Sequence, residues 1–439
     1  MRDSFRISPS ARRKLRRSAA LAMTATLATG LLAACGSDDN GGDGQITLNV
    51  AVFGQFGFEE AGLYEEYERL HPNITIEQSS VAENADYIRQ LRNRLTQNSG
   101  LADIQAIEVG NIAEMTGDLN PRWIDFNEYG VDVDHFQDWK VTQATTEDGR
   151  LIGLGTDIGP MAVCYQPELF EQAGLPSDPE ELAAAWEGDW GAYVDLGEQY
   201  AENAPEGTTF TDSAGGVFNA VVYGYEERFY NADGEYIYET SPAVQDAWEL
   251  SSRVATTEGM SAQLQQFSDE WNRAVANGDF ASIVCPAWML NFIQETSGER
   301  GEGRWNVTTA PQTSNWGGSF IGVPEASEHK EEAAELAAWL TAPEQQARLF
   351  TERSMFPSSA EAAEMPEVRD ATNPYFQDAP TGEIFSEAAG QIPDAAIGPR
   401  DQTIQEQFTN GLVQIERQGV SPDQAWDNVL SELENALAE

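Results

Sequence analysis

An alternation of strand and helix patterns begins at Ile46 and limits the chain to few folds. The apolar run Ile46–Phe53 is typical of a buried strand, and the helical pattern after it ends at Pro72. A second strand pattern "ITIEQ", an amphipathic segment over Ala85–Thr96 and a third strand pattern "ADIQAIEV" follow. This order predicts βαβ units, in which helices cover a parallel sheet. Ligands of such sheets bind beyond the carboxyl ends of the strands, which here carry "GQFGF" and "EVGN".

A second alternating set starts with "IGPMAVCYQPELFEQAGLP". It includes a helical stretch over Glu180–Tyr200 and the strand pattern "ASIVCP", and after "NWGGSFIGVP" the chain becomes mostly helical. From Gln45 onward the chain has about 395 residues, which is more than one hydrophobic core usually organises. We therefore expect two lobes.

The first 35 residues have the pattern of an export signal. Seven basic residues precede a short apolar run, Ala19–Ala34, and small residues in "LLAAC" precede Cys35. The ending resembles a bacterial lipoprotein box, in which the cysteine becomes the lipidated first residue; the alternative is an ordinary signal peptide with a chance cysteine. We predict a signal peptide over residues 1–34, a lipidated Cys35 and a flexible, glycine-rich tether over residues 35–44. The protein is then expected at the extracellular face of the cell membrane, held there by its lipid anchor, with the export route left open.

The charge balance excludes some classes of partner. The full chain has 25 basic and 73 acidic residues, and removal of residues 1–34 takes away seven basic residues and one acid. The mature chain then has 18 basic and 72 acidic residues, a net charge of −54. Such a surface repels phosphate backbones, so we expect no nucleic-acid partner.

Two cysteines remain besides Cys35. Cys164 and Cys285 each lie in a strand-like run, and in an exported protein such an isolated pair favours a disulfide, with two buried free thiols as the alternative. The three histidines lie far apart in the sequence and lack ligand-like spacing. We predict no metal site and no cofactor.

Six motifs, taken in order, resemble the extracellular solute-binding proteins of carbohydrate ABC importers, which are related in fold to maltodextrin-binding protein. They are "GLYEEYERLHPNITI", "DIQAIEVGNIAEM", "MAVCYQPELFEQAGLP", "NGDFASIVCPAWM", "GGSFIGVPEASEHKEEAAELAAWLTAPEQQARLF" and "MFPSS". The segments "GQFGFEEAGLYEEY", "GLGTDIGPMAVCY" and "NWGGSF" together look most like lipoproteins that bind cellobiose and longer cello-oligosaccharides.

This resemblance implies an α/β, two-lobed periplasmic-binding-protein-like fold of class II, with hinged lobes and a central cleft. By analogy, residues 45–156 and 317–372 form lobe 1, and residues 157–316 and 373–439 form lobe 2. It also implies a monomer that closes on an oligosaccharide and delivers it to the membrane permease of an ABC importer, without catalysing a reaction.

A sugar has two apolar C–H faces and a polar rim, so its binder needs flat aromatic rings and hydrogen-bonding groups around them. Aligned on the family's strand-then-aromatic motif, Trp288 falls at a stacking position, although Trp is also a frequent core residue. Trp316 lies beside two glycines that permit close backbone approach, with packing at the hinge as the alternative. The remaining candidates lie at element ends: Gln55, Phe56, Glu108, Asn111, Asp157, Asp212 and Arg400.

Two rival functions stay open from the residues alone. An exported glycoside hydrolase would also carry aromatic platforms and a pair of carboxylates, but among 73 acids such pairs carry no information. The chain contains neither a G-x-S-x-G nor an H-E-x-x-H motif. The other rival is a binding protein for a polyamine, a metal, a peptide or another oligosaccharide.

Overall fold

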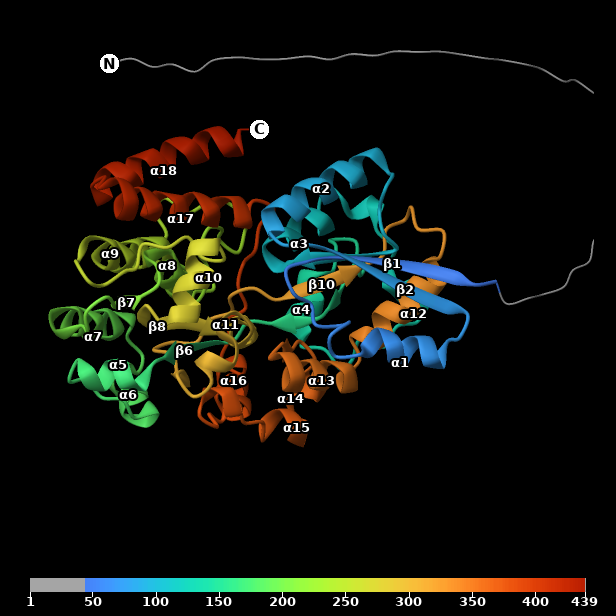
Figure 1. Ribbon diagram of the computed structural model, residues 1–439. Helices are drawn as coiled ribbons and strands as arrows, with labels where there is room; N and C mark the ends of the chain where they lie inside the picture. Colours follow the sequence, from blue (N-terminus) through green and yellow to red (C-terminus); the bar gives the residue numbers. More distant parts are fainter. Residues whose placement is uncertain (1–43, 439) are drawn as a thin grey trace, which may run out of the picture. The chain divides into compact units, whose positions relative to one another are not determined.

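The computed structural model describes residues 44–438 (Figure 1). The expected signal peptide, Cys35 and most of the tether lie outside the described residues. The chain from Gln45 onward forms one compact unit. Among residues 44–438, no helix combines the length and apolar character needed to cross a membrane.

The first sheet has five strands in the order β2-β1-β3-β10-β4. Their bounds are β1 Ile46–Phe53, β2 Ile74–Val81, β3 Ile104–Glu108, β4 Leu154–Gly155 and β10 Ser319–Gly322. Strand β1 runs parallel to β2 and β3, which confirms the predicted βαβ units. Strand β10 runs antiparallel to β3 and β4. The antiparallel strand arises because the chain returns to this sheet only after it has built the second one.

The second sheet has four strands in the order β7-β8-β6-β9. Their bounds are β6 Met161–Tyr165, β7 Thr209–Thr211, β8 Phe280–Pro286 and β9 Asn306–Thr309. A short antiparallel ladder joins β5 Asp157–Ile158 to β11 Phe356–Pro357. Strand β5 lies on the stretch where the chain passes from the first sheet to the second.

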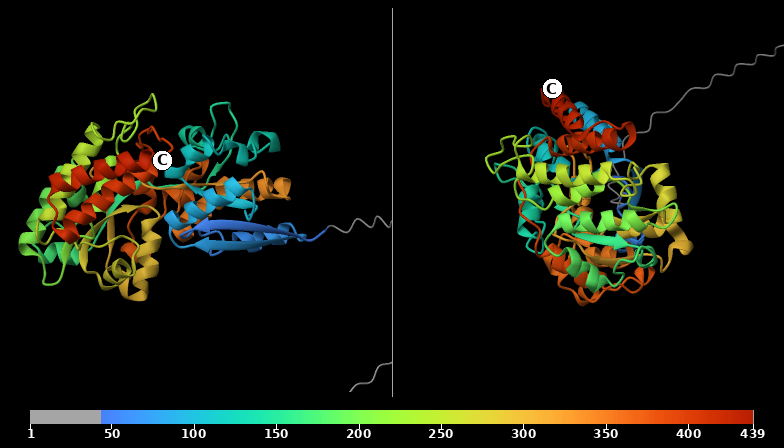
Figure 2. Two further views of the ribbon diagram at one scale, coloured as in Figure 1. Left: turned by 90° about the horizontal axis from the view of Figure 1, so that it is seen from above. Right: turned by 90° about the vertical axis from the view of Figure 1, so that its left-hand side faces the viewer.

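The helices divide into three groups (Figures 1 and 2). Those around the first sheet are α1 Leu63–Leu70, α2 Asn84–Gln97, α3 Val109–Thr116, α4 Asp138–Gln143 and α12 Lys330–Leu340. Those around the second sheet are α5 Pro167–Gln172, α6 Pro179–Trp186, α7 Trp190–Asn203, α8 Ala214–Val222, α9 Pro242–Thr256, α10 Asp269–Asn277, α11 Met289–Ser297, α17 Asp401–Gln418 and α18 Pro422–Leu437. The segment between α12 and α17 contains β11 and forms α13 Pro343–Arg353, α14 Ala360–Ala363, α15 Pro366–Arg369 and α16 Thr381–Ala389.

The expected helix over Glu180–Tyr200 is two helices, α6 and α7. Gly188 lies between them with φ +75°, a conformation that ends a helix and that glycine adopts without strain. Asp189 then begins α7, because its side chain accepts a hydrogen bond from the backbone N–H of Gly191. The helical period continues through this break in the sequence, so the pattern alone did not reveal it.

The core consists of three apolar clusters. The first lies around β1, β3 and β10, the second between α7, α8, α9 and α17, and the third between β6, β8 and the helices α10, α11 and α13–α16. Helix α13 contributes Leu349 to the first cluster and Phe350 to the third, so it packs against both parts of the body. The lobe boundaries drawn from the resemblance stay a prediction.

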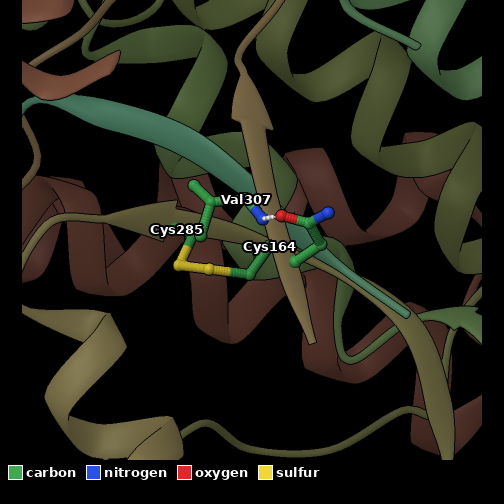
Figure 3. The surroundings of a disulfide bond; sticks show 4 residues. Cys164, Cys285 and Val307 are labelled. Atoms are coloured by element: carbon green, nitrogen blue, oxygen red, sulfur yellow. Dashed lines mark hydrogen bonds between the residues drawn. A yellow bond between two sulfur atoms is a disulfide. The ribbon is translucent and has the colours of Figure 1, made fainter. Parts of the chain in front are cut away.

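Cys164 and Cys285 form a disulfide inside the third cluster (Figure 3). They lie on the adjacent antiparallel strands β6 and β8, with Cα atoms 5.5 Å apart. Both residues are fully buried, and Val307 on β9 is the partner of Cys164 on the other side. The bond therefore links two strands of one sheet near the end of β8. Trp288 follows shortly after this strand ends.

Candidate functional site

A cleft of about 570 Å³ lies where the ends of the two sheets face each other. Three surfaces of the lining have distinct chemistry. The polar wall is Glu108 and Asp157; the aromatic wall is Phe267, Trp288, Phe292 and Trp316; the α17 face is Gln402, Gln405, Glu406, Thr409, Asn410, Val413 and Glu416.

The polar wall is formed at the carboxyl ends of β3 and β4. Glu108 is the N-cap of α3, and its Oε2 accepts a hydrogen bond of 2.6 Å from the backbone N–H of Gly110. Asp157 Oδ1 accepts from Thr156 Oγ1 at 2.8 Å and from the backbone N–H of Ser319 at 3.0 Å. Each carboxylate therefore has one oxygen held by the protein.

The other oxygens of these two carboxylates are free to bind a ligand. Within residues 44–438, Glu108 Oε1 and Asp157 Oδ2 accept no hydrogen bond from the protein, and both residues line the cleft. Burial raises the pKa of the Glu108 carboxyl to about 7, and burial also raises the pKa of Asp157. The nearby Lys140 ammonium acts on both carboxyls in the opposite direction.

The aromatic wall surrounds Trp288, which is partly exposed and sits at the N-cap position of α11. Its ring lies 5.7 Å from that of Trp316 at an interplanar angle of 76°, and its Nε1 donates to the Trp316 carbonyl oxygen at 2.9 Å. Phe267 and Phe292 lie 6.0 and 6.4 Å from the Trp288 ring. Trp288 thus packs on other rings and also lines the cleft, and its role as a platform for a sugar stays a prediction.

Two glycines give the indoles their positions. A Cβ atom at Gly159 would lie 1.8 Å from the Trp316 carbonyl oxygen, a distance that no side chain tolerates. Gly317 has φ +84°, and a Cβ there would lie 3.0 Å from Trp288 Nε1. These glycines are required because the chain crosses between the two sheets directly beside the rings.

The sequence did not indicate the α17 face, apart from the nearby Arg400, nor did it indicate Phe267 and Phe292 of the aromatic wall. The residues of the α17 face lie at positions i, i+3, i+4, i+7, i+8, i+11 and i+14 from Gln402, which share one side of the helix. Ile404, Phe408, Leu412 and Ile415 on the opposite side are buried in the second cluster. Such a polar stripe on an amphipathic helix normally indicates a solvated surface, so nothing local in the sequence distinguishes it from a cleft wall.

Gln55 and Phe56 lie in the turn after β1 and line the cleft at its rim. Asn291 Nδ2 donates to Gln55 Oε1 at 2.8 Å, and Gln55 Nε2 donates to a carboxylate oxygen of Glu295. Glu295 also forms an ion pair with Arg353. This rim contact joins the end of β1 directly to α11.

Three of the predicted residues do not line the cleft. Asp212 is fully buried and accepts hydrogen bonds from Trp271 Nε1 and from Gln266 Nε2, at 2.7 and 2.8 Å, so it fixes Gln266, a lining residue. Asn111 is buried behind Asn84, whose Nδ2 donates to its Oδ1 at 3.3 Å. Arg400 precedes α17, and its backbone N–H donates to the hydroxyl of Tyr230. Their expected role in binding stays a prediction.

Comparisons with known proteins agree with this architecture. A family model described as bacterial extracellular solute-binding protein matches residues 62–376. The lactose-binding protein of Rhizobium radiobacter is 25% identical over 393 residues, which cover 85% of this chain and 83% of that protein.

Two solved structures are similar over nearly their whole length. A crystal structure described as extracellular solute-binding protein family 1 has 37% sequence identity and a TM-score of 0.77, and the match covers 89% of this chain and 99% of that chain. The ABC transporter associated binding protein from B. animalis subsp. lactis Bl-04, in complex with β-1,6-galactobiose, has 16% identity, a TM-score of 0.75 and coverages of 88% and 96%; at this identity it shows the fold alone. The expected two-lobed α/β fold is confirmed, and the chain belongs to the bacterial extracellular solute-binding proteins.

Proposed function

We propose that the protein is the substrate-binding component of a bacterial ABC sugar importer and that it captures a cello-oligosaccharide, such as cellobiose or cellotriose, in the cleft. Membership in a solute-binding family makes the chain a binding protein and not an enzyme. The observation that carries the proposal is the pairing of two indoles with two carboxylates that have free oxygens, across one cleft.

The chemistry of this pairing fits a neutral sugar. Burial of about 50–80 Å² of a pyranose face against one indole contributes on the order of 1–2 kcal/mol. Micromolar binding requires about 8 kcal/mol, so hydrogen bonds from the rim must add to the stacking. Carboxylates are acceptors only, and a charge-assisted hydrogen bond from a sugar hydroxyl is stronger than a neutral one.

The charge of the lining restricts the ligand further. Five acidic residues line the cleft as the structure describes it: Glu83, Glu108, Asp157, Glu406 and Glu416. No lysine, arginine or histidine is part of that lining. A uronic acid or a sugar phosphate would place its negative charge against these carboxylates without a compensating cation, so we expect both to be excluded.

Relatives support a sugar and leave its identity open. The similar proteins named above bind lactose and β-1,6-galactobiose, as their descriptions state. The preference for a β-1,4-linked glucose chain rests on the motifs "GQFGFEEAGLYEEY", "GLGTDIGPMAVCY" and "NWGGSF", and on the flat C–H faces that all-equatorial glucose units present to the indoles.

A titration followed by tryptophan fluorescence and calorimetry tests the proposal. Cellobiose and cellotriose should bind at micromolar concentration, lactose and maltose more weakly, and cellobiouronic acid and spermidine not at all. Binding of maltose or lactose in preference to both cello-oligosaccharides would contradict the cello-oligosaccharide assignment. Saturable binding of spermidine without any sugar binding would replace the sugar by a cationic cargo.

We further propose that Cys35 carries the lipid anchor, which keeps the protein at the extracellular face of the membrane near its permease. The support is the basic, apolar and "LLAAC" series of the sequence. Metabolic labelling with a fatty acid should mark the wild-type chain, and Cys35→Ala should not be labelled. An unlabelled wild-type chain would remove the anchor and leave the sugar-binding proposal untouched.

A further inference from the structure

Lys140 is a buried lysine that the binding site described above does not use. Lys140 lies on α4 and is only 1% exposed. Its Nζ has no hydrogen-bond partner within residues 44–438. The ammonium group lies 3.9 Å from the centre of the Phe320 ring, a cation–π contact. A Cβ atom at Gly155 would lie 2.9 Å from Lys140 Cγ, so this glycine makes room for the lysine stem. An unpaired buried cation is costly, and its retention needs an explanation.

The residues around Phe320 place Lys140 next to the polar wall. Phe320 on β10 pairs with Ile107 on β3 and with Gly155 on β4, the two strands that lead into Glu108 and Asp157. Ser319, one residue earlier, pairs with Glu108 and donates its backbone N–H to Asp157 Oδ1. Lys140 is therefore placed beside the two strands that lead into the carboxylates, and Lys140 itself does not line the cleft.

We propose that Lys140 is a positioning residue of the cleft: from its place against Phe320, its buried charge favours the ionised forms of Glu108 and Asp157, which accept charge-assisted hydrogen bonds from a ligand. This role rests on the sugar-binding function proposed above. Lys140 does not touch the ligand; it acts only through the two carboxylates. The arrangement also explains why these carboxylates can face the cleft without a basic residue in its lining.

Other charges face the same groups and have to be counted. Arg228 and Asp401 form a buried ion pair with an N–O distance of 3.0 Å, and both act on Glu108 with opposite signs. Asp157 and Glu108 are the two charged groups that act on Lys140. Burial lowers the pKa of Lys140 to about 8, whereas these carboxylates raise it, so at pH 7 the lysine is mostly protonated.

The proposal predicts a direction for the pH dependence. Burial raises the pKa of Glu108 to about 7, so acidification from pH 8 to pH 6 protonates it and removes one charged acceptor from the cleft. Sugar affinity should therefore fall as the pH falls through 7. Removal of the Lys140 charge should move the Glu108 titration to higher pH, because Lys140 is the first charged group that opposes its burial.

The test compares Lys140→Met with Lys330→Met, because Lys330 is the only other lysine in the described residues and forms an ion pair with Glu325 on the surface. The first readout is the ¹³C NMR titration of the Glu108 carboxyl in ligand-free protein, assigned by its loss in Glu108→Gln. The second readout is cellobiose affinity between pH 5.5 and 8.5. Lys140→Gln and Lys140→Arg accompany the methionine variant, so that a neutral polar replacement and a charge-retaining one are available if methionine does not fold.

In Lys140→Met and Lys140→Gln, we expect the midpoint of the Glu108 titration to rise by at least one pH unit and the cellobiose affinity at pH 7 to fall about tenfold. In Lys330→Met, both quantities should equal those of the wild type. In Lys140→Arg, both should lie closer to the wild-type values. An unchanged Glu108 titration in the neutral variants would overturn the role of Lys140, whether or not sugar binds. Failure of the wild-type protein to bind any sugar would instead overturn the proposed function, and the NMR titration would still report on Lys140.

Discussion

The carboxylates of the polar wall are held by backbone N–H groups, whereas the indoles of the aromatic wall are held by neighbouring rings and by glycines that leave space for them. The first arrangement fixes charge at the ends of strands and makes binding sensitive to pH. The second fixes shape and has no titratable group. In the proposed function the two walls divide the recognition of a sugar between its hydroxyl rim and its apolar faces, and each wall can be disturbed separately.

The disulfide offers the largest disturbance next to the aromatic wall, because Cys285 lies three residues before Trp288. The double change Cys164→Ser, Cys285→Ser should lower the free energy of unfolding by about 2–5 kcal/mol, since the bond closes a loop with a sequence separation of 121 residues. Urea unfolding of the oxidised protein measures it. The ¹³C titration of Glu108 should stay in place.

Thiol counting on the denatured, unreduced wild type is the control for this change. Two titratable thiols, or equal unfolding midpoints of wild type and variant, would show that the pair does not stabilise the second sheet.

The polar wall is disturbed by Glu108→Gln and by Asp157→Asn, which keep the shape and remove the charge. Each should weaken cellobiose binding by about 1.5–3 kcal/mol, or roughly 10–150-fold, because hydrogen bonds to charged groups contribute about that much. Glu108→Gln should also abolish the fall in affinity below pH 7. Glu328→Gln, on an exposed carboxylate, serves as the matched control.

The Glu108→Gln variant also tests the pH dependence of stability. Stability should fall as the pH rises, whereas affinity should fall as the pH falls. Because the pKa of Glu108 is raised in the folded protein, the folded state holds this proton more firmly than the unfolded chain, and ligand-free stability should decrease as the pH rises towards and through 7. Glu108→Gln should remove this part of the slope of the melting temperature against pH. An identical slope in both proteins would contradict the pKa direction.

The aromatic wall is disturbed by Trp288→Ala, which should weaken sugar binding by at least tenfold, about 1.4 kcal/mol, at every pH between 6 and 8. Some stability should be lost as well, because the ring packs on Phe267 and Phe292, but less than the 3–5 kcal/mol typical of a fully buried tryptophan. Trp426→Ala, a partly exposed tryptophan outside the cleft, should lose stability without losing affinity. Normal sugar affinity in Trp288→Ala would show that the residue is core only.

The sequence was most informative where local pattern and tertiary role coincide. Strand β1 begins and ends at the predicted residues Ile46 and Phe53, because its apolar residues alternate with Thr47 and Asn49 and then continue as a run to Phe53. Glu108 was predicted because it follows the third strand, and parallel strands bring ligands to their carboxyl ends. The break between α6 and α7 escaped notice because a single glycine, Gly188, does not interrupt the helical period.

Other parts of the site depend on contacts that no local pattern encodes. Nothing in the sequence around Lys140 marks it as part of the site, and only the packing of α4 against β10 buries it beside the polar wall. Asp212 follows a strand as a ligand-binding residue should, but its lone pairs are taken by Trp271 and Gln266, which lie more than 50 residues further along the chain. The α17 face has the ordinary polar pattern of a solvated helix and becomes a wall only because α17 lies across the cleft from β3.

The rim contact between Gln55, Glu295 and Arg353 tests whether the two walls alone decide affinity. Glu295 is exposed, and exposed ion pairs contribute about 0–1 kcal/mol because water screens them and two long side chains must be ordered. Glu295→Gln should therefore change cellobiose affinity by less than about fivefold, and Arg353→Ala should do the same. Calorimetry at low and high salt measures both, with little difference between the salts. A loss greater than tenfold would mean that the rim, and not only the walls, stabilises the ligand-bound cleft, and the contact of Asn291 with Gln55 would then be the next to remove.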